Sequence, residues 1–299
     1  MTRTILGLDI GGSKTHAIRL EDGLVKAEAV TASANVQNVS REAASAALAE
    51  AVRAVGAQTV QEVYAGAGGI DTDDDAAALR ALIAPLVPRA SIQVVHDSRL
   101  VLAAGRARMG IAVIVGTGAV AWGTDARGRQ ARSGGWGYLL GDEGSGYWLA
   151  REAVRHCLGR HDRDLPPDRL SAALLADCGL GRPVELIARF HGIGAGSRSG
   201  PDRGYWSARA GVVVAAAEAG DPAARAILDA GTAEIAERIL QVARQLDITG
   251  PVILGGSLGA KVPLVREGIR QALAPHGITD VAGLDREPVF GVDVLAGLA

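Results

Sequence analysis

The chain contains little cysteine, few aromatic residues and no long apolar run. Cys157 and Cys178 are its two cysteines, and neither belongs to a CxxC pair. This usage argues against a disulfide scaffold and favours a reducing compartment, with both thiols buried and inert. No run of about 18 apolar residues is present, so no membrane span is expected. Because the N-terminus also lacks a basic segment followed by an apolar one, we expect a cytoplasmic protein.

An excess of charge of one sign is missing too. The formal net charge is −2 over 299 residues, which argues against a nucleic-acid-binding or membrane-binding protein. Apolar residues make up 48% of the chain and charged residues 21%, as in globular proteins. A chain of this length is long for a single core, so two domains are predicted.

Glycine, by contrast, is concentrated in two short turns that each follow an apolar, β-rich run. They are Gly11-Gly12-Ser13-Lys14-Thr15 and Gly116-Thr117-Gly118. A hairpin turn of glycines leaves backbone N–H groups uncovered, so that an anion can approach closely. Two such turns, each near the start of a predicted domain, favour a clamp around a polyphosphate. The first turn is not a P-loop, because Ser13 takes the place of the glycine before Lys14 and a strand follows.

The apolar pattern of the first part of the chain predicts an α/β domain with the order βββαβαβα. Three strands form a meander around the first glycine turn, and two more alternate with helices. The predicted strands are residues 4–10, 15–20, 24–30, 61–66 and 91–95. The predicted helices are residues 40–54, residues 72–86 and a helix that begins at Asp97.

The same order begins again after Gly110, which predicts a duplicated architecture without a visible sequence repeat. Strands are expected at 111–115, 119–124, 130–133 and 252–254. Helices are expected at 144–190, 205–247 with a break at 220–222, and 262–273, with an exposed loop at 191–203. We place one domain at residues 1–108 plus 290–299 and the other at 109–289. Hinges are expected near 105–110 and 288–291, with the apolar tail 289–298 packed on the first domain.

Asp9 is a charged residue at the end of an apolar strand, directly before the first glycine turn. A carboxylate in this place can hold a hydrated Mg²⁺ against phosphate groups. The alternative is a turn aspartate that accepts backbone hydrogen bonds. The second glycine turn favours the phosphate interpretation.

Three short motifs resemble those of the actin/hexokinase/heat-shock-70 ATPase superfamily. Asp9-x-Gly-Gly-Ser-Lys-Thr, Gly116-Thr117-Gly118 and Gly255-Gly256-Ser257 look like its phosphate 1, phosphate 2 and adenosine motifs. The segment GGWGYLLGDEGS, from Gly134 to Ser145, is similar to the signature of the N-acetylglucosamine kinase branch, which is grouped with the BadF/BadG/BcrA/BcrD ATPases. The resemblance covers essentially the whole chain and implies two ribonuclease H-like, actin-like ATPase domains.

The resemblance also implies an ATP- and Mg²⁺-dependent kinase that phosphorylates the 6-hydroxyl of an aminosugar. Asp97 matches the base that activates this hydroxyl; an N-cap on the following helix is the alternative, and both can hold at once. Asp9 matches the metal-binding carboxylate. The residues that match nucleotide contacts are Gly11, Gly12, Ser13, Lys14, Thr15, Thr117, Gly118, Gly255, Gly256 and Ser257. The residues that match sugar contacts are Asn35, Gly69, Asp97, Gly135, Trp136 and Asp142.

Asp142 has helix capping as its alternative, because a helix is expected to begin near Gly144. After Gly118, many family members carry Ser-Asn, whose asparagine contacts the sugar near C2, whereas this chain has Ala119-Val120. The change favours glucosamine narrowly over N-acetylglucosamine and leaves a plain hexose open. The expected partners are a small sugar and ATP, and the family implies a homodimer.

Two other classes of function compete with the kinase. A BadF-type activator of an iron–sulfur dehydratase holds a [4Fe–4S] cluster with cysteines at a dimer interface, whereas Cys157 and Cys178 lie in no matching context. A non-catalytic, nucleotide-gated binding protein is opposed by the sugar signature. His156, Cys157, His161 and Cys178 lack the spacing of zinc-ligand pairs, so no structural zinc is expected.

Overall fold

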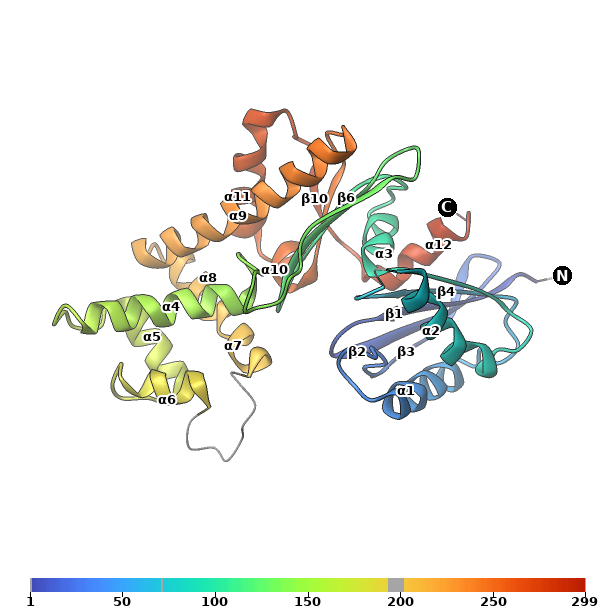
Figure 1. Cartoon of the computed structure of the whole chain (residues 1–299), viewed down its shortest axis with the longest axis horizontal. Helices are drawn as coiled ribbons and strands as arrows, with labels where there is room; N and C mark the ends of the chain where they lie inside the picture. Colours follow the sequence, from blue (N-terminus) through green and yellow to red (C-terminus); the bar gives the residue numbers. More distant parts are fainter. Residues whose placement is uncertain (1, 71, 193–201, 299) are drawn as a thin grey trace. The chain divides into compact units, whose positions relative to one another are not determined.

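A computed structural model of the chain describes residues 2–70, 72–192 and 202–298 (Figure 1). Contacts divide the chain into two compact units, Met1–Arg108 with Leu284–Ala299, and Met109–Gly283. Each unit contains a five-stranded mixed sheet with helices. This confirms the predicted α/β class with two similar sheets, while the domain and hinge positions drawn from the sequence stay predictions.

The first unit is built on a sheet with the strand order β3-β2-β1-β4-β5. The first three strands of the chain pair antiparallel, and β1, β4 and β5 pair parallel. The strands are β1 (Thr4–Ile10), β2 (Lys14–Glu21), β3 (Leu24–Ala32), β4 (Glu62–Ala67) and β5 (Ser91–His96). The helices are α1 (Arg41–Ala54), α2 (Asp73–Ile83), η1 (Ala84–Leu86), α3 (Asp97–Ala104), η3 (Pro288–Gly291) and α12 (Val292–Leu295).

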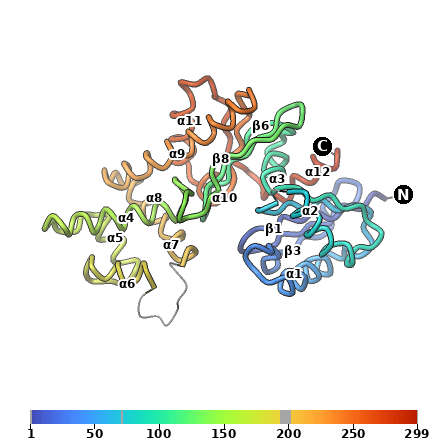
Figure 2. Tube along the Cα trace, viewed as in Figure 1, coloured from blue at the N-terminus to red at the C-terminus, as the bar shows by residue number. Residues whose placement is uncertain are grey.

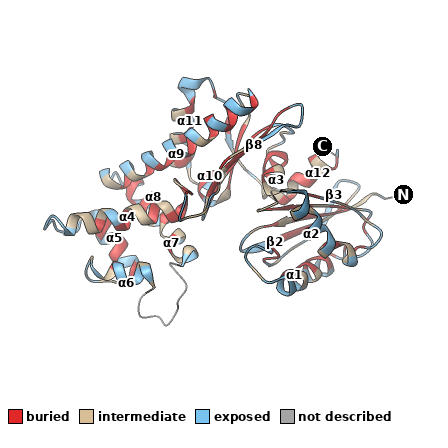
Figure 3. Ribbon diagram, in the orientation of Figure 1, coloured by how far each residue is buried: buried red, intermediate tan, exposed pale blue. Residues whose placement is uncertain are grey.

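The side chains of β1 alternate between the two faces of this sheet, as a strand requires. Leu6, Leu8 and Ile10 are buried in the core that α1 and α2 complete. Ile5 belongs to the other core, which α3 and the C-terminal tail complete, and Asp9 lies on that face by the same alternation. Figure 3 colours the described residues by how far each is buried. The alternation therefore turns Asp9 toward the side of the sheet that carries α3.

The second unit is built on a sheet with the order β10-β9-β6-β7-β8, in which β9 pairs parallel with both β6 and β10. The strands are β6 (Gly110–Val115), β7 (Ala119–Thr124), β8 (Gln130–Gly134), β9 (Val252–Gly255) and β10 (Val281–Gly283). The helices are α4 (Gly146–His161), α5 (Arg169–Cys178), α6 (Glu185–His191), α7 (Arg203–Ala208), α8 (Ala210–Glu218), α9 (Pro222–Leu246), α10 (Gly256–Lys261), α11 (Pro263–Leu273) and η2 (Ala274–His276). No helix in the described part of the chain is long and apolar enough to cross a membrane.

Local signals account for most of these helix ends. Ser40 caps α1, and Asp221 caps α9 with Pro222 in the first turn, as the sequence predicts. The break between α7 and α8 at Arg209 was not predicted. β10 was also missed, since a three-residue strand carries almost no periodic signal. Most of the predicted loop, residues 193–201, lies outside the described residues.

The C-terminal tail packs on the first unit. Val289 and Val292 are fully buried with Ile5, Ile18 and Leu100. Figure 2 shows α12 beside α3, although the two helices are far apart in the sequence. This apolar contact attaches the last residues of the chain to the helix that begins at Asp97.

The tail approaches α3 closely at Gly291, which makes a test possible. A Cβ at Gly291 would lie 2.5 Å from the Leu100 carbonyl oxygen and 2.6 Å from the Ala104 nitrogen. We expect Gly291→Ala to lower the free energy of unfolding by roughly 1–3 kcal/mol, because helix backbone has to move. Chemical denaturation followed by circular dichroism measures the effect.

The matched control is Gly211→Ala on α8, where a Cβ would meet nothing within 4 Å. There alanine is expected to keep or raise stability, because it favours a helix over glycine. Equal stability of the Gly291→Ala variant and the wild type would contradict close docking of the tail on α3.

Candidate active site

The first glycine turn connects β1 to β2. The Gly11 N–H donates to the Lys14 carbonyl over 2.9 Å, and the Ser33 hydroxyl donates to the Gly11 carbonyl over 2.8 Å. Gly12, Ser13 and Lys14 are exposed, and a Cβ at Gly12 would lie 2.9 Å from the Asn38 side-chain nitrogen. The turn therefore presents exposed backbone, and a side chain at Gly12 would meet the amide end of Asn38.

Thr15 follows the turn but is completely buried. Its hydroxyl oxygen accepts a hydrogen bond of 2.9 Å from the Ala34 N–H. The residue thus connects β2 to the segment that carries Asn35, and its side chain lies inside the unit rather than on the exposed turn.

Asp9 and Asp97 come together around Gly66. Asp9 is the register partner of Gly66 on β4, and a Cβ at Gly66 would lie 3.5 Å from the Asp97 Cα and clash with Leu100. Glycine at position 66 thus permits α3 to begin directly against β4. Burial first, and then the charges of Asp97 and Glu287, raise the pKa of Asp9 to about 7 against the lowering effect of Lys14.

Asp97 is the first residue of α3, and its side chain does not cap this helix. The capping interpretation was wrong, because His96 is the N-cap and its Nδ1 accepts from the Ser98 N–H over 3.2 Å. Asp97 Oδ1 lies 3.0 Å from His96 Nδ1, yet it is buried without a hydrogen-bond partner among the described residues. The carboxylate therefore keeps its capacity to accept a proton or a hydrogen bond.

Asn35 and the glycines after β4 lie next to Asp97. Asn35 Nδ2 donates to the Gly68 carbonyl over 3.1 Å, and its Oδ1 accepts from the Gln37 N–H over 2.9 Å. A Cβ at Gly68 would lie 3.2 Å from Asp97 Oδ2 and 3.7 Å from Asn35 Nδ2. Gly69 has a φ of +78°, and its carbonyl accepts from Gln37 Nε2 over 3.0 Å. The first unit thus brings Asn35, Gly69 and Asp97 into one cluster.

In the second unit, the turn after β6 lies beside the start of α10. The Gly116 N–H donates to the Gly118 carbonyl over 2.9 Å. Because β9 is the parallel neighbour of β6, Gly255 pairs with Ile114, and a Cβ at Gly116 would lie 3.8 Å from Ser257 Oγ. Thr117 and Ser257 are exposed. The fold therefore joins the second and third glycine motifs at one edge of the sheet.

Asp142 packs against this second turn. The residue is 3% exposed, and a Cβ at Gly118 would lie 2.8 Å from its Oδ2. Helix capping, the alternative for Asp142, was wrong, because Ser145 caps α4. Asp142 Oδ1 accepts from the Ala119 N–H over 3.4 Å, and Oδ2 lies 3.3 Å from Arg203 Nη2. Burial raises the pKa of Asp142, and the Ala119 N–H and Arg203 oppose that shift.

Gly135 and Trp136 precede Asp142 on the same signature segment. Gly135 has a φ of +72°, and its carbonyl accepts from Arg132 Nη2 over 2.8 Å. The Arg132 guanidinium lies 5.0 Å from the centre of the Trp136 ring. Trp136 is 64% exposed, and Leu139 and Leu140 are more exposed still. The segment therefore combines a buried carboxylate with apolar side chains that face solvent in the second unit.

Three residues near these clusters were missed from the sequence. Gln37 and Glu287 lie beside Gly69 and Lys14, and the Lys14–Glu287 ion pair measures 3.4 Å. Arg203 belongs to α7 and contacts Asp142 from far along the chain. No motif marks such residues, because their position depends on which segments meet in the folded unit.

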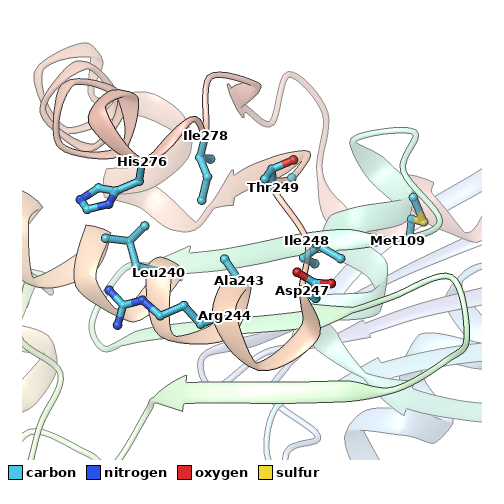
Figure 4. Close-up of a pocket in the computed structure, with 10 residues that line it drawn as sticks. Met109, Leu240, Ala243, Arg244, Asp247, Ile248, Thr249, His276 and Ile278 are labelled. Atoms are coloured by element: carbon cyan, nitrogen blue, oxygen red, sulfur yellow. The ribbon is translucent and has the colours of Figure 1, made fainter.

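A cavity of about 500 Å³ also opens in the second unit, between the C-terminal end of α9 and the segment after η2 (Figure 4). Its lining combines apolar residues such as Leu240 and Ile278 with Arg244 and His276. None of the residues predicted to contact sugar or nucleotide lines it, so it is separate from the candidate site.

The cysteines lie in the core of the second unit, where Cys157 is 1% and Cys178 5% exposed. Burial raises the pKa of the Cys157 thiol. His156 contacts Asp168 over 2.7 Å through Nε2. Within residues 2–70, 72–192 and 202–298, no group of three or more His, Cys, Asp or Glu side chains could hold a metal ion.

Comparison with known proteins identifies the family. A sequence model of the BadF/BadG/BcrA/BcrD ATPases matches residues 6–282. The chain belongs to the BadF/BadG/BcrA/BcrD ATPase family. This confirms the resemblance found in the motifs.

Two curated relatives carry kinase names. An N-acetylmuramic acid/N-acetylglucosamine kinase of Clostridium acetobutylicum is 36% identical over 167 residues, which cover 53% of this chain and 55% of the relative. An N-acetyl-D-glucosamine kinase of Dictyostelium discoideum is 28% identical over 200 residues, which cover 61% of this chain and 63% of the relative. The chain thus spans less than two thirds of the length of each.

Among solved structures, a Porphyromonas gingivalis protein provisionally assigned as an N-acetylglucosamine kinase has a TM-score of 0.75 and 23% identity. The match covers 97% of this chain and 96% of that chain. A Streptomyces griseus glucokinase of the ROK family, solved with glucose and AMPPNP, has a TM-score of 0.60 and 18% identity. That match covers 99% of both chains. At these identities the likeness establishes a shared fold.

The raised pKa of Asp9 makes its effect on stability dependent on pH. Below about pH 4 the carboxyl is protonated in both the folded and the unfolded chain. As the pH rises toward 7 the unfolded chain ionises first, so the wild type loses stability, and the loss levels off above pH 7. Asp9→Asn is therefore expected to be more stable than the wild type by roughly 2–4 kcal/mol at pH 8, with little difference at pH 4.

Urea unfolding at both pH values, without nucleotide or divalent cation, measures this difference. Asp285→Asn is the control, because Asp285 is exposed in the same unit. A stability gain of Asp9→Asn that does not change with pH would contradict the buried-carboxyl explanation.

Proposed function

We propose that this chain is an ATP-dependent kinase that phosphorylates the 6-hydroxyl of an aminosugar, either glucosamine or N-acetylglucosamine. Membership in an ATPase family and the names of the curated relatives support this activity. The observation that carries the proposal is the Asp97 carboxylate, which is free of helix capping and lies beside Gly68 and Asn35. A sugar hydroxyl needs such a free acceptor for its proton.

Asp97 acts as the general base in this proposal. Its carboxylate accepts the proton of the 6-hydroxyl as the oxygen attacks the terminal phosphoryl group. Because His96 Nδ1 accepts the Ser98 N–H, the helix has a side-chain cap other than Asp97. Asp97 Oδ1 accepts no hydrogen bond from the residues that the structure describes, so a ligand hydroxyl would be a natural partner for it.

The glycine turns hold the phosphates of ATP in this proposal. In the first unit the contacts come from Gly11, Gly12 and Ser13, with the ammonium group of Lys14 nearby. Lys14 has a 3.4 Å partner in Glu287, and we assign it to exchange this carboxylate for a phosphate. Thr15 supports the turn from inside the unit.

The second unit supplies Thr117 and Gly118 to the phosphates, and Gly255, Gly256 and Ser257 to the nucleoside. Gly256 has a φ of +78° and packs against the Val115 carbonyl. A side chain would therefore be strained there and would separate α10 from β6. This close packing keeps the third motif beside the second.

Asp9 fits a Mg²⁺ ion as well. Mg²⁺ prefers carboxylate oxygens and is often bound by one or two of them together with phosphates and water. Asp9 is partly buried near the charge of Asp97, and both of these raise its pKa; the positive charge of a bound ion would offset them. Asp9 would hold the ion with Asp97 near it. The ion would neutralise phosphate charge when bound.

Asn35, Gly69, Gly135, Trp136 and Asp142 contact the sugar in this proposal. Asn35 and Asp142 are nearly buried, and each has a polar side chain suited to hydroxyl groups. Trp136 offers an exposed ring that can stack on a sugar face. Homodimer formation and residence in the cytoplasm are part of the same proposal.

The iron–sulfur activator is not favoured by any contact in the described residues. Its cluster needs accessible thiolates, whereas both cysteines are buried in the core of the second unit.

Replacing Asp97 tests the proposed chemistry. Asp97→Asn keeps the size of the side chain but cannot accept the proton, so kcat/KM for the best sugar is expected to fall about 10²- to 10⁴-fold. The assay compares glucosamine, N-acetylglucosamine, glucose and mannose with ATP and Mg²⁺. Asp285→Asn serves as the control, since Asp285 is an exposed aspartate in the same unit.

Two results would overturn the proposal. One is a wild type that phosphorylates neither aminosugar. The other is an Asp97→Asn variant that retains most of the wild-type activity on each sugar that the wild type accepts.

A further inference from the structure

The buried carboxylate of Asp142 has an unusual environment. Asp142 is 3% exposed, and its backbone φ of +59° lies in the left-handed region. A Cβ at Gly118 would lie within 2.8 Å of Oδ2, so the carboxylate fills the space beside the second glycine turn. A buried charge without compensation is costly and tends to become protonated. Asp142 therefore depends on the donors around it.

Arg203 is the cation that compensates this charge. Its Nη2 lies 3.3 Å from Asp142 Oδ2, while the Ala119 N–H is 3.4 Å from Oδ1. The Arg203 guanidinium also lies 5.1 Å from the centre of the Tyr138 ring, a distance at which cation and ring attract each other. Tyr138 and Asp142 lie on one segment, so Arg203 contacts the signature segment twice.

The backbone around Arg203 is well defined. Asp202 is the N-cap of α7, and its Oδ1 accepts from the Tyr205 N–H over 2.9 Å. Arg203 is thus the first residue of that helix. Its side chain is 41% exposed, and a guanidinium carries five N–H donors. Donors remain available for a ligand while Nη2 contacts Asp142.

We propose that Arg203 is a positioning and specificity-determining residue of the sugar site: it orients Asp142, keeps it charged, and makes the site favour an uncharged aminosugar over a cationic one. This inference rests on the proposed kinase function. An ion pair offers hydroxyl groups both an acceptor and a donor. To an ammonium group the pair offers no net attraction, because the charge of Arg203 cancels that of Asp142. N-acetylglucosamine is uncharged, whereas glucosamine carries an ammonium group near neutral pH.

The charged and titratable groups around Asp142 lead to a pH dependence. Arg203 lowers the pKa of Asp142, the neighbouring Glu143 raises it, and Tyr138 faces Arg203. Glu143 itself pairs with Arg238 on α9. Without Arg203 the buried carboxylate would protonate at higher pH and would lose part of its acceptor capacity. Sugar binding by such a variant should therefore weaken as the pH falls.

The test compares Arg203→Met, which keeps an apolar stem without the charge, with Arg203→Lys, which keeps the charge. Arg203→Met is expected to raise the KM for N-acetylglucosamine roughly 10- to 100-fold at pH 7, and more at pH 6 than at pH 8.5. The kcat and the KM for ATP should change much less. Arg203→Lys should recover part of the sugar KM. The wild type should have a higher kcat/KM for N-acetylglucosamine than for glucosamine, and Arg203→Met should reduce the ratio of these two values.

Arg189→Met is the matched control. Arg189 also lies over a tyrosine ring, 5.8 Å from Tyr205, and is exposed. Far-UV circular dichroism and thermal unfolding show whether each variant is folded. If Arg203→Met does not fold, the sugar KM of Arg203→Lys measured over the same pH series tests the inference.

The outcomes separate the two proposals. A wild type inactive on each sugar overturns the kinase function itself. If the wild type is active, only the role of Arg203 is in question. That role is overturned if Arg203→Met leaves the sugar KM and its pH profile unchanged, or if the sugar KM of Arg203→Lys is as high as that of Arg203→Met. A wild type that prefers glucosamine overturns the proposed preference for an uncharged aminosugar.

Discussion

Glycine at the ends of strands is the constraint on which both candidate clusters depend. At Gly66 the missing side chain permits α3 to begin directly against β4, so that Asp97 lies close to Asp9. At Gly118 it leaves room for the Asp142 carboxylate. A methyl group at either position would occupy space that helix or carboxylate atoms already fill. The acidic side chains proposed for catalysis and sugar binding are thus placed by backbone that carries no side chain.

Burial at these positions has an electrostatic consequence that differs between the two units. In the first unit, burial and the charge of Asp97 raise the pKa of Asp9 to about 7, and Lys14 opposes the shift. This arrangement suits a ligand that brings positive charge, as Mg²⁺ does. In the second unit, Arg203 lies beside the carboxylate of Asp142 and compensates it. The two carboxylates therefore differ in their surroundings, since Asp9 lies near a second acidic side chain and Asp142 lies beside an arginine.

Helix capping shows how a local pattern can suggest the wrong partner. Aspartate is a favoured N-cap, and both Asp97 and Asp142 stand near the start of a helix. In the structure, His96 and Ser145 take that role, so neither Asp97 nor Asp142 caps its helix.

The sequence alone determined the α/β class, most strands and helices, and the family, because alternation, capping residues and glycine turns are local signals and GGWGYLLGDEGS is a long motif. The three-residue strand β10, the break at Arg209 and the contacts of Gln37, Glu287 and Arg203 needed the tertiary structure. The strand pairing of β10 and the contacts of the three side chains depend on segments that are distant in the chain and meet only when the unit folds. Asp142 illustrates both cases: a motif identified the residue, but folding decided that its carboxylate is buried and faces an arginine from α7.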